Sequence, residues 1–595
     1  MTAAPLEHPV FSEIDRHFAR LVGRLSASAS PEVILAAALA SCQRREGHIC
    51  VDLRRVAGTC FPKKPEEEGA VPIVLPTLES FLTALKACPA VGQPGEFRPL
   101  ILDSRNRLYL HRYWEYESNL AQAILQRAQE TAEGVNTAQL RDGLERFFPA
   151  EVISAEPDFQ KIAAETAVKR KLCVISGGPG TGKTRTVGVL LALLIEQAGQ
   201  KPLRIALAAP TGKAAARLQE SIKKLRTTLL CAEVIRERLP EEASTVHRLL
   251  GSAPDSARFR YNAENLLPFD VVVVDEASMV DLALMAKLFA AIPRCARVIL
   301  LGDKDQLASV EAGAVLGDIC AGAGDQSCAL SSCIVELRKN FRFGVDNGIF
   351  ALSQAINDGE VAQVERLLSD KDGRRDGLGS DNLPSPSQLK ERLSEAVLTG
   401  FGEAMRMREP LATLQALSRF RILCALRQGP YGVEAVNRLV EEILREARLI
   451  PARERWYAGR PVMVTRNDYD LRLFNGDVGV ILPHPDSGEP RAWFLGADNT
   501  LRDVSPLRLP EHETVFAMTV HKSQGSEFER VLFLLPDRES PVLTRELIYT
   551  GVTRASQRVE VWFDAGILRA ALAQTVERTS GLREALWGGE QTPSL

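Results

Sequence analysis

The sequence predicts an α/β protein with two lobes, each built on a parallel sheet, and three observations lead to this prediction. A glycine-rich loop at 177–184 lies between an apolar run of strand length and a helical pattern. Four consecutive valines, 271–274, are typical of a strand buried on both faces of a parallel sheet. Further apolar runs, such as 531–535, alternate with helical patterns later in the chain. Strands and helices that alternate in this way build parallel sheets covered by helices.

Length and composition indicate several domains and no membrane span. The chain has 595 residues, and a domain usually holds about 100–200 residues. The formal net charge is -3, so any nucleic-acid site is expected to be a local groove. No apolar run reaches the roughly 18 residues that a membrane span needs, and no signal peptide is recognisable. The eleven cysteines form no C-x-x-C pair, which favours a reducing, cytoplasmic location.

Residues 1–150 are expected to form a separate, mainly helical domain. Apolar residues recur at helical spacing near the start, and the segment 99–110 is typical of a β-hairpin that turns at 104–106. Basic and aromatic residues are concentrated at 107–116. They could contact nucleic acid, but internal packing or docking of a partner is the favoured interpretation.

The glycine-rich loop predicts a nucleoside triphosphate site. Its pattern is G-x-x-x-x-G-K-[ST], in which backbone amides curl around the β-phosphate and the helix start adds its positive dipole end. Lys183 is expected to reach the β- and γ-phosphates, and the Thr184 hydroxyl to ligate Mg²⁺. The nucleotide contacts predicted for this segment are Gly177, Gly178, Pro179, Gly180, Thr181, Gly182, Lys183, Thr184 and Arg185.

Two acidic residues, Asp275 and Glu276, follow the valine run directly. Carboxylates at the end of a buried strand are costly unless they face a site. Asp275 is expected to hold the Mg²⁺ shell, and Glu276 to orient and deprotonate the attacking water. Together with the glycine-rich loop, they predict an ATP hydrolase.

Three more residues are predicted to respond to the γ-phosphate. Gln306 follows another predicted strand, 298–301, and is placed to sense the phosphate and pass its state toward DNA. Arg342 is expected to contact the γ-phosphate, and Arg554 to act as an arginine finger. Such cations balance the charge that develops in the transition state.

Polar residues that follow other predicted strands are candidate DNA contacts, because the carboxyl ends of parallel strands face a ligand crevice. Hydroxyl residues at such places are also ordinary helix caps, so both interpretations stay open. The candidate DNA contacts are Thr211, Lys213, His247, Thr519, His521 and Lys522. Between about 455 and 510 the apolar period changes, and a hairpin turn at 475–477 predicts a small inserted β-barrel.

In sequence and in order, these segments resemble superfamily 1 helicases. Residues 302–313 and 518–527 are similar to the RecD family, the alpha subunit of exodeoxyribonuclease V (RecBCD), and the resemblance covers about 155–595. It implies two RecA-like P-loop motor domains, 151–343 and 344–595, and an SH3-like fold for the insertion. It also implies that Gln160 reads adenine and that Glu527 contacts the nucleotide.

The resemblance implies a function as well. A RecD-like chain is an ATP- and Mg²⁺-dependent DNA helicase that moves 5′→3′ along single-stranded DNA. It acts with RecB-like and RecC-like subunits on double-stranded DNA ends, in double-strand break repair and recombination. Residues 1–150 would dock on the RecC-like subunit, and a partner would supply the nuclease activity.

Two alternatives to a DNA-translocating helicase are weaker. A nucleotide-gated subunit that clamps DNA without moving could lose Glu276 or Arg554, yet both are present. An intrinsic nuclease would need clustered acids and a lysine outside the ATP site for two-metal chemistry. No separate domain with such a cluster is recognisable after the second lobe.

Overall fold

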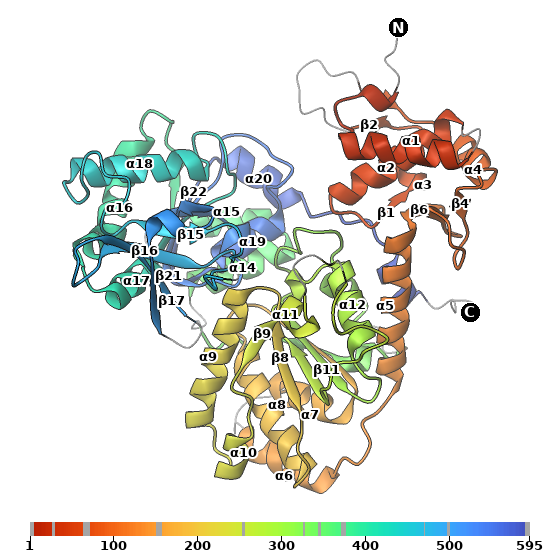
Figure 1. Ribbon diagram of the computed structural model, residues 1–595, viewed down its shortest axis with the longest axis horizontal. Coiled ribbons are helices and arrows are strands. Elements are labelled where there is room, and N and C mark those ends of the chain that lie inside the picture. Colours follow the sequence, from red (N-terminus) through yellow and green to blue (C-terminus); the bar gives the residue numbers. More distant parts are fainter. Residues whose placement is uncertain are drawn as a thin grey trace.

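The structure is a computed structural model in which the protein folds into two α/β lobes and an N-terminal domain (Figure 1). The described residues are 5–26, 30–62, 72–149, 157–252, 256, 258–324, 328–342, 347–369, 376–468, 470–496 and 500–588. The predicted domain boundaries at 150/151 and 343/344 therefore lie outside the described residues.

The first lobe is a six-stranded, wholly parallel sheet in the order β12-β7-β11-β10-β8-β9. In β10, Val271 and Val273 pack into one hydrophobic core, and Val272 and Val274 pack into another on the opposite face. The prediction of a strand buried on both faces is thus confirmed. The strands are β7 (Leu172–Gly177), β8 (Ile205–Ala209), β9 (Ala243–Thr245), β10 (Val271–Val274), β11 (Arg297–Gly302) and β12 (Ile334–Leu337). The helices are α7 (Phe159–Lys169), α8 (Lys183–Ala198), α9 (Gly212–Thr228), α10 (Glu233–Glu237), α11 (Val246–Leu250), α12 (Leu282–Ala291) and α13 (Val315–Cys320).

The second lobe is a five-stranded parallel sheet in the order β13-β22-β21-β14-β20. Its core includes Phe401, whose ring lies 5.0 Å from the rings of both Phe420 and Phe516. The strands are β13 (Leu378–Asn382), β14 (Phe420–Cys424), β20 (Ala517–Thr519), β21 (Phe528–Leu534) and β22 (Ala555–Phe563). The helices are α14 (Gly348–Asp358), α15 (Val361–Ser369), α16 (Leu389–Arg406), α17 (Pro410–Arg419), α18 (Val433–Glu446), α19 (Arg545–Val552) and α20 (Ala565–Ala573).

An antiparallel sheet is inserted into the second lobe, in the order β18-β17-β16-β15-β19. The segment after the turn at 475–477 pairs back on β15 as predicted. The sheet ends at Thr514, slightly beyond the predicted limit, and an SH3-like fold for it stays a prediction. Its strands are β15 (Pro461–Val464), β16 (Val478–Pro483), β17 (Pro490–Leu495), β18 (Leu501–Val504) and β19 (His512–Thr514).

The N-terminal domain contains a four-stranded sheet, β1-β6-β5-β4, in addition to its helices. The predicted hairpin is confirmed: β5 and β6 are antiparallel, and Asn106 turns the chain with φ 61°. Its strands are β1 (Cys50–Asp52), β2 (Cys60–Phe61), β3 (Ile73–Val74), β4 (Val91–Gly92), β5 (Leu100–Leu102) and β6 (Arg107–Leu110). Its helices are α1 (Glu13–Leu25), α2 (Pro31–Arg45), α3 (Leu53–Val56), α4 (Leu78–Lys86) and α5 (His111–Gln129). Helix α6 (Thr137–Phe147) also precedes residue 151, but its Leu140 and Leu144 pack into a core of the first lobe (Figure 1).

Helix α5 ties this domain to the first lobe, along whose side it lies (Figure 1). Leu120 and Ile124 of α5 share a core with Leu288 of α12. Tyr109, just before the helix, is buried, and Trp114 packs against the same core. The basic and aromatic segment 107–116 therefore includes residues that pack internally, in line with the favoured interpretation.

Residues 574–588, here called the C-terminal strap, leave the second lobe and return to the other two units. The Ile49 amide donates to the carbonyl of Thr579 at 2.8 Å, and the Gly581 amide donates to Glu117 Oε2 at 2.8 Å. The strap ends in α21 (Leu582–Trp587), whose Leu582 and Leu586 join the core of the first lobe. The strap thus packs on the first lobe although it follows the second lobe in sequence.

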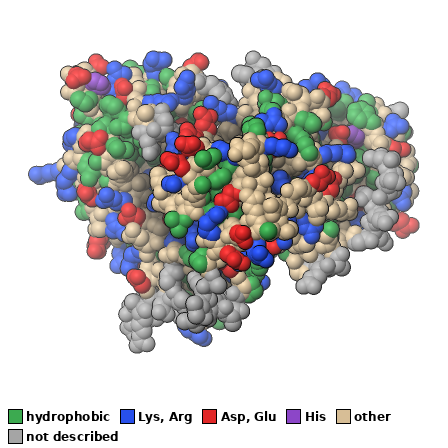
Figure 2. Space-filling model, turned by 90° about the horizontal axis from the view of Figure 1, so that it is seen from below, with side chains coloured by type: hydrophobic (Ala, Val, Ile, Leu, Met, Phe, Trp, Pro, Cys, Tyr) green, Lys and Arg blue, Asp and Glu red, His purple; other side chains and the backbone are tan. Residues whose placement is uncertain are grey.

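One face of the molecule shows how its surface charges are distributed. On the face drawn in Figure 2, basic and acidic side chains are interspersed, as the net charge of -3 leads one to expect. Among the described helices, none combines the length and the apolar character required to cross a membrane.

The buried Glu117 predicts that docking of the strap depends on pH. Burial raises the pKa of Glu117 from the usual 4.5 to about 7, although Gly581, Arg107 and Tyr109 all favour the carboxylate and thus lower it. The docked state therefore holds a proton that the undocked state releases. We expect strap protection to be greatest below about pH 4.5 and to be lost as the pH rises through about 7.

Hydrogen exchange of the strap, corrected for intrinsic rates, measures this dependence. Glu117→Gln keeps the hydrogen-bond acceptor but cannot titrate, so its protection is expected to vary little with pH. Glu115→Gln, at an exposed position of the same helix, serves as the control. An unchanged pH dependence in Glu117→Gln contradicts the prediction.

Candidate nucleotide site between the two lobes

A cavity lies where the two lobes meet, and both lobes form its walls. The first lobe contributes the loop 179–184, residues from α9, and the segments that follow β10, β11 and β12. The second lobe contributes 525–527, Thr553 and Arg554. The predicted site residues that line the cavity are Pro179, Gly180, Thr181, Gly182, Lys183, Thr184, Asp275, Glu276, Gln306, Arg342, Glu527 and Arg554.

The glycine-rich loop is shaped by backbone that other residues rarely adopt. Gly180 and Gly182 have φ angles of 84° and 81°, a region that favours glycine. A Cβ on Gly182 would lie 2.2 Å from the side-chain nitrogen of Gln160. Lys183 Nζ donates to the carbonyls of Gly177 and, at 3.2 Å, Gly178. The loop therefore holds the ammonium group at the start of α8, where a phosphate would bind.

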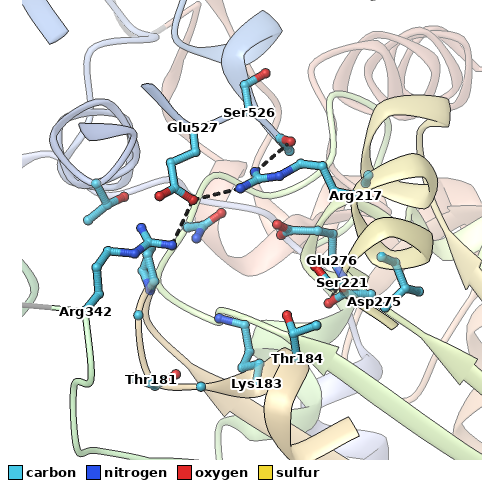
Figure 3. Close-up of a pocket in the computed structure, with 18 of the residues that line it drawn as sticks. Thr181, Lys183, Thr184, Arg217, Ser221, Asp275, Glu276, Arg342, Ser526 and Glu527 are labelled. Carbon is cyan, nitrogen blue, oxygen red and sulfur yellow. Dashed lines mark hydrogen bonds and ion pairs between the residues drawn. The ribbon is translucent and has the colours of Figure 1, made fainter. Parts of the chain in front are cut away.

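Asp275 and Glu276 leave the carboxyl end of β10 in a tight turn. Glu276 has φ 52°, and its amide donates to Asp275 Oδ1 at 2.9 Å. Burial and the charge of Glu276 raise the pKa of Asp275 to about 6, while Lys183 lowers it. A carboxylate in this position is stabilised by a nearby cation. Thr184 lines the same cavity (Figure 3), and the two oxygens are of the kind that Mg²⁺ prefers.

Gln306 faces the cavity and belongs to a hydrogen-bond network that crosses between the lobes. Its Nε2 donates to Asp303 Oδ2 at 3.1 Å, and the hydroxyl of Tyr549 from the second lobe donates to the same oxygen at 2.8 Å. The next residue, Leu307, donates its amide to Thr550 Oγ1 at 3.0 Å. Sequence reasoning missed Asp303 and Tyr549. The position of Asp303 directly after β11, like that of Asp275 after β10, was the signal for it.

Arg554 is buried in the second lobe and lines the cavity. Its Nε donates to the carbonyl of Thr550 at 3.1 Å, and its Nη1 donates to that of Ser526 at 3.2 Å. Burial lowers the pKa of Arg554, whereas the negative charge of Glu276 raises it. An anchored cation on the second lobe thus faces the acids of the first lobe.

Glu527 joins the lobes through two arginines of the first lobe (Figure 3). Its Oε2 lies 2.8 Å from Arg342 Nη2 and 2.7 Å from Arg217 Nη2. Arg217 also donates to the carbonyl of Gly525 at 3.0 Å. Sequence reasoning missed Arg217. The sequence signal for it is the helical spacing of Ala214, Arg217, Leu218 and Ser221, which places them on one face of α9. All four residues line the cavity.

Four predicted nucleotide contacts lie outside the cavity wall: Gln160, Gly177, Gly178 and Arg185. The Gln160 amide is buried and donates to the carbonyl of Thr181 at 2.9 Å. In this structure it braces the loop, and its reading of adenine stays a prediction. A Cβ on Gly178 would lie 2.9 Å from the Tyr549 hydroxyl, so a side chain there would press on that hydroxyl.

The candidate DNA contacts lie on both lobes, away from the cavity wall, and two of them are helix caps or turn residues. Thr211 Oγ1 accepts from the amide of Ala214 at 3.2 Å, and Thr519 Oγ1 accepts from that of Lys522 at 3.2 Å. Lys522 Nζ forms an ion pair with Glu513 at 2.7 Å. These contacts within the protein do not test whether the residues bind DNA, so the proposed DNA contacts stay predictions.

The other three candidates have distinct environments. Burial and the charges of Arg421 and Arg217 lower the pKa of Lys213 to about 7. Burial and Arg578 lower the pKa of His521. His247 is exposed and packs edge-on against Phe259 at 5.8 Å.

Three family models match the chain. Residues 7–109 match the N-terminal domain of RecBCD enzyme subunit RecD, 160–312 match an AAA domain, and 514–561 match a UvrD-like helicase C-terminal domain. The matches cover parts of the N-terminal domain and of both lobes.

Curated relatives match over nearly the full length. RecBCD enzyme subunit RecD of Mycolicibacterium smegmatis is 42% identical over 97% of this chain and 98% of that protein. The subunit of the same name from Haemophilus influenzae is 34% identical, with the same coverage of both chains. The ATP-dependent RecD2 DNA helicase of Deinococcus radiodurans is 31% identical over 70% of this chain and 50% of that protein. The chain belongs to the RecD family of RecBCD enzyme subunits.

Proposed function

We infer that this protein is an ATP-dependent DNA helicase and translocase that acts as the RecD-type subunit of a RecBCD-type enzyme. The observation that carries this inference is the division of the nucleotide site between two lobes. Lys183 and Glu276 belong to the first lobe, and Arg554 belongs to the second. A nucleotide bound there contacts both lobes, so its hydrolysis changes how the lobes are held together.

The residues of the cavity supply the parts that phosphoryl transfer requires. Lys183 and the loop amides neutralise the β- and γ-phosphates, and Glu276 orients and deprotonates the attacking water. Thr184 and Asp275 would hold Mg²⁺, whose charge stabilises the phosphate oxygens. Arg342 and Arg554 approach the γ-phosphate and balance the charge of the transition state.

Movement along DNA follows from this cycle. ATP draws Arg342 and Arg554 toward the glycine-rich loop and closes the lobes, and hydrolysis lets them open. Unequal grip on single-stranded DNA by the two lobes turns each cycle into a 5′→3′ step. Thr211, Lys213, His247, Thr519, His521 and Lys522 are the proposed DNA contacts.

The proposal extends to partners, by analogy with the named relatives. RecB-like and RecC-like subunits would complete a heterotrimer in the cytoplasm that acts on DNA ends in repair and recombination, with a partner supplying the nuclease activity. Helix α1 offers a docking surface, because Ile14, Leu21 and Leu25 are 69%, 42% and 56% exposed and share one helix face. Exposed apolar stripes of this kind mark protein contacts.

Lys183→Gln tests the motor site. Removal of the ammonium group is expected to reduce ATP turnover at least about 100-fold, because a preorganised charge at the reacting phosphates is lost. The purified chain is assayed with single-stranded DNA, and Lys201→Gln, at an exposed position, serves as the control. ATP-driven unwinding that persists in Lys183→Gln would refute the assignment of the site.

Strand displacement on duplexes with a single overhang tests the direction. Unwinding from a 5′ overhang but not from a 3′ overhang is expected, because the motor must load on a single strand and move 5′→3′. The assay is run with the chain alone and with its two partner subunits. Unwinding from the 3′ overhang would preserve the helicase and overturn the polarity.

Ile14→Ser combined with Leu21→Ser tests the docking surface. We expect binding to the RecC-like subunit to weaken about 10- to 100-fold, because buried apolar anchors carry most of the energy of an interface. ATP turnover by the isolated chain should stay within twofold, roughly the scatter of surface substitutions. Leu230→Ser, at an 80% exposed position of the first lobe, is the matched control. Unchanged binding places the interface elsewhere.

A further inference from the structure

One carboxylate oxygen of the second lobe is shared by two arginines of the first. Glu527 Oε2 lies 2.7 Å from Arg217 Nη2 and 2.8 Å from Arg342 Nη2. Arg217 comes from α9, and Arg342 follows β12. Figure 3 shows the two guanidinium groups reaching Glu527 from different sides, above Lys183 and Thr184. The carboxylate therefore occupies the wall of the cavity opposite the glycine-rich loop.

A triphosphate would compete with Glu527 for these arginines. Guanidinium groups bind phosphate in the same geometry as carboxylate, and more than one phosphate oxygen is available to them. The ion pairs are only partly shielded, since the side chains of Glu527, Arg217 and Arg342 are 24%, 43% and 27% exposed. Such pairs exchange partners at little cost. A phosphate that reached the same two guanidinium groups would therefore compete with Glu527 for them.

Replacement of Glu527 by a phosphate would affect the whole segment 525–527. Gly525, Ser526 and Glu527 contact three arginines of the cavity, because the carbonyl of Gly525 accepts from Arg217 and that of Ser526 accepts from Arg554. Gly525 has φ 68° and follows the short helix His521–Ser523 by two residues. Movement of 525–527 would therefore act directly on the segment that contains His521 and Lys522.

We propose that Glu527 is a positioning residue that acts as a nucleotide-state switch. Without nucleotide it holds Arg217 and Arg342 in ion pairs across the lobes. When a nucleoside triphosphate binds, its terminal phosphate replaces Glu527 as their partner, and the released segment 525–527 passes the change to the neighbouring helix. The switch rests on the proposed function, and it assigns Arg217 to the phosphate-responsive set.

This role and direct contact with the nucleotide predict opposite effects for Glu527→Gln. If Glu527 competes with the phosphate, removal of its charge weakens its hold on the arginines, and a non-hydrolysable ATP analogue should bind about two- to fivefold more tightly, the range for a partly exposed ion pair. ADP lacks the γ-phosphate and should change much less. If Glu527 instead binds the nucleotide, the same substitution weakens both ligands.

The experiment measures the affinity of the purified full chain for the ATP analogue and for ADP by calorimetry, and the stimulation of ATP turnover by single-stranded DNA. We expect Glu527→Gln to bind the analogue more tightly and to lose several-fold in stimulation, and Glu527→Asp to restore part of both. Glu529→Gln makes the same change of charge two residues later, outside the cavity, and should resemble the wild type. In an Arg217→Gln background, Glu527→Gln should change the affinity less.

The possible results distinguish failure of the proposed switch from failure of the proposed function. Weaker or unchanged binding of the analogue by Glu527→Gln overturns the switch while leaving the ATPase intact. Equal gains for the analogue and ADP also overturn it, because the terminal phosphate is then not the competitor. Failure of the wild-type chain to bind either nucleotide overturns the proposed function itself.

Discussion

The nucleotide cavity depends on charged side chains that find their partners across the boundary between the lobes. Of the described residues that line it, four are cations and three are carboxylates: Lys183, Arg217, Arg342, Arg554, Asp275, Glu276 and Glu527. Charged groups drawn out of water are costly unless they are paired or hydrogen-bonded. Arg217 finds its carboxylate on the opposite lobe, and the charge of Glu276 acts on Arg554 from the other side. An anionic ligand in the cavity therefore alters the balance that holds the lobes together.

Much of this site could be predicted because parallel sheets place sequence-local signals at one edge. Lys183, Asp275 and Asp303 all follow the carboxyl ends of neighbouring strands, β7, β10 and β11. Each strand contains a short apolar run; β10 and β11 are followed at once by an acidic residue and β7 by the glycine-rich loop, so the pattern is visible in the sequence. The valine run confirms this reasoning, since its alternate residues enter the cores on opposite faces of the sheet.

The contacts between the lobes and those of the C-terminal strap could not be predicted, because they join segments that are far apart in the sequence. Arg217 and Glu527 are 310 positions apart, and on a helix Arg217 looks like any solvated cation. Gly581 and Glu117 are separated by 464 positions, and nothing near the C-terminal strap indicates that it returns to α5. Thr211 and Thr519 show a second reason why prediction fails: a local pattern can be recognised without revealing the residue's function. A hydroxyl at the end of a strand satisfies a nearby amide whether or not it also meets DNA.

The contacts across the lobe boundary differ in how costly they are to break, and this difference directs any motion. The Tyr549–Asp303 and Leu307–Thr550 hydrogen bonds are buried, so breaking one without replacement costs about 1–3 kcal/mol. The ion pairs of Glu527 are partly exposed, and water or phosphate can replace them at about 0–1 kcal/mol. A nucleotide therefore acts on the weaker part of the boundary. After hydrolysis the lobes are expected to open there, while the buried hydrogen bonds and the contacts of the C-terminal strap stay in place.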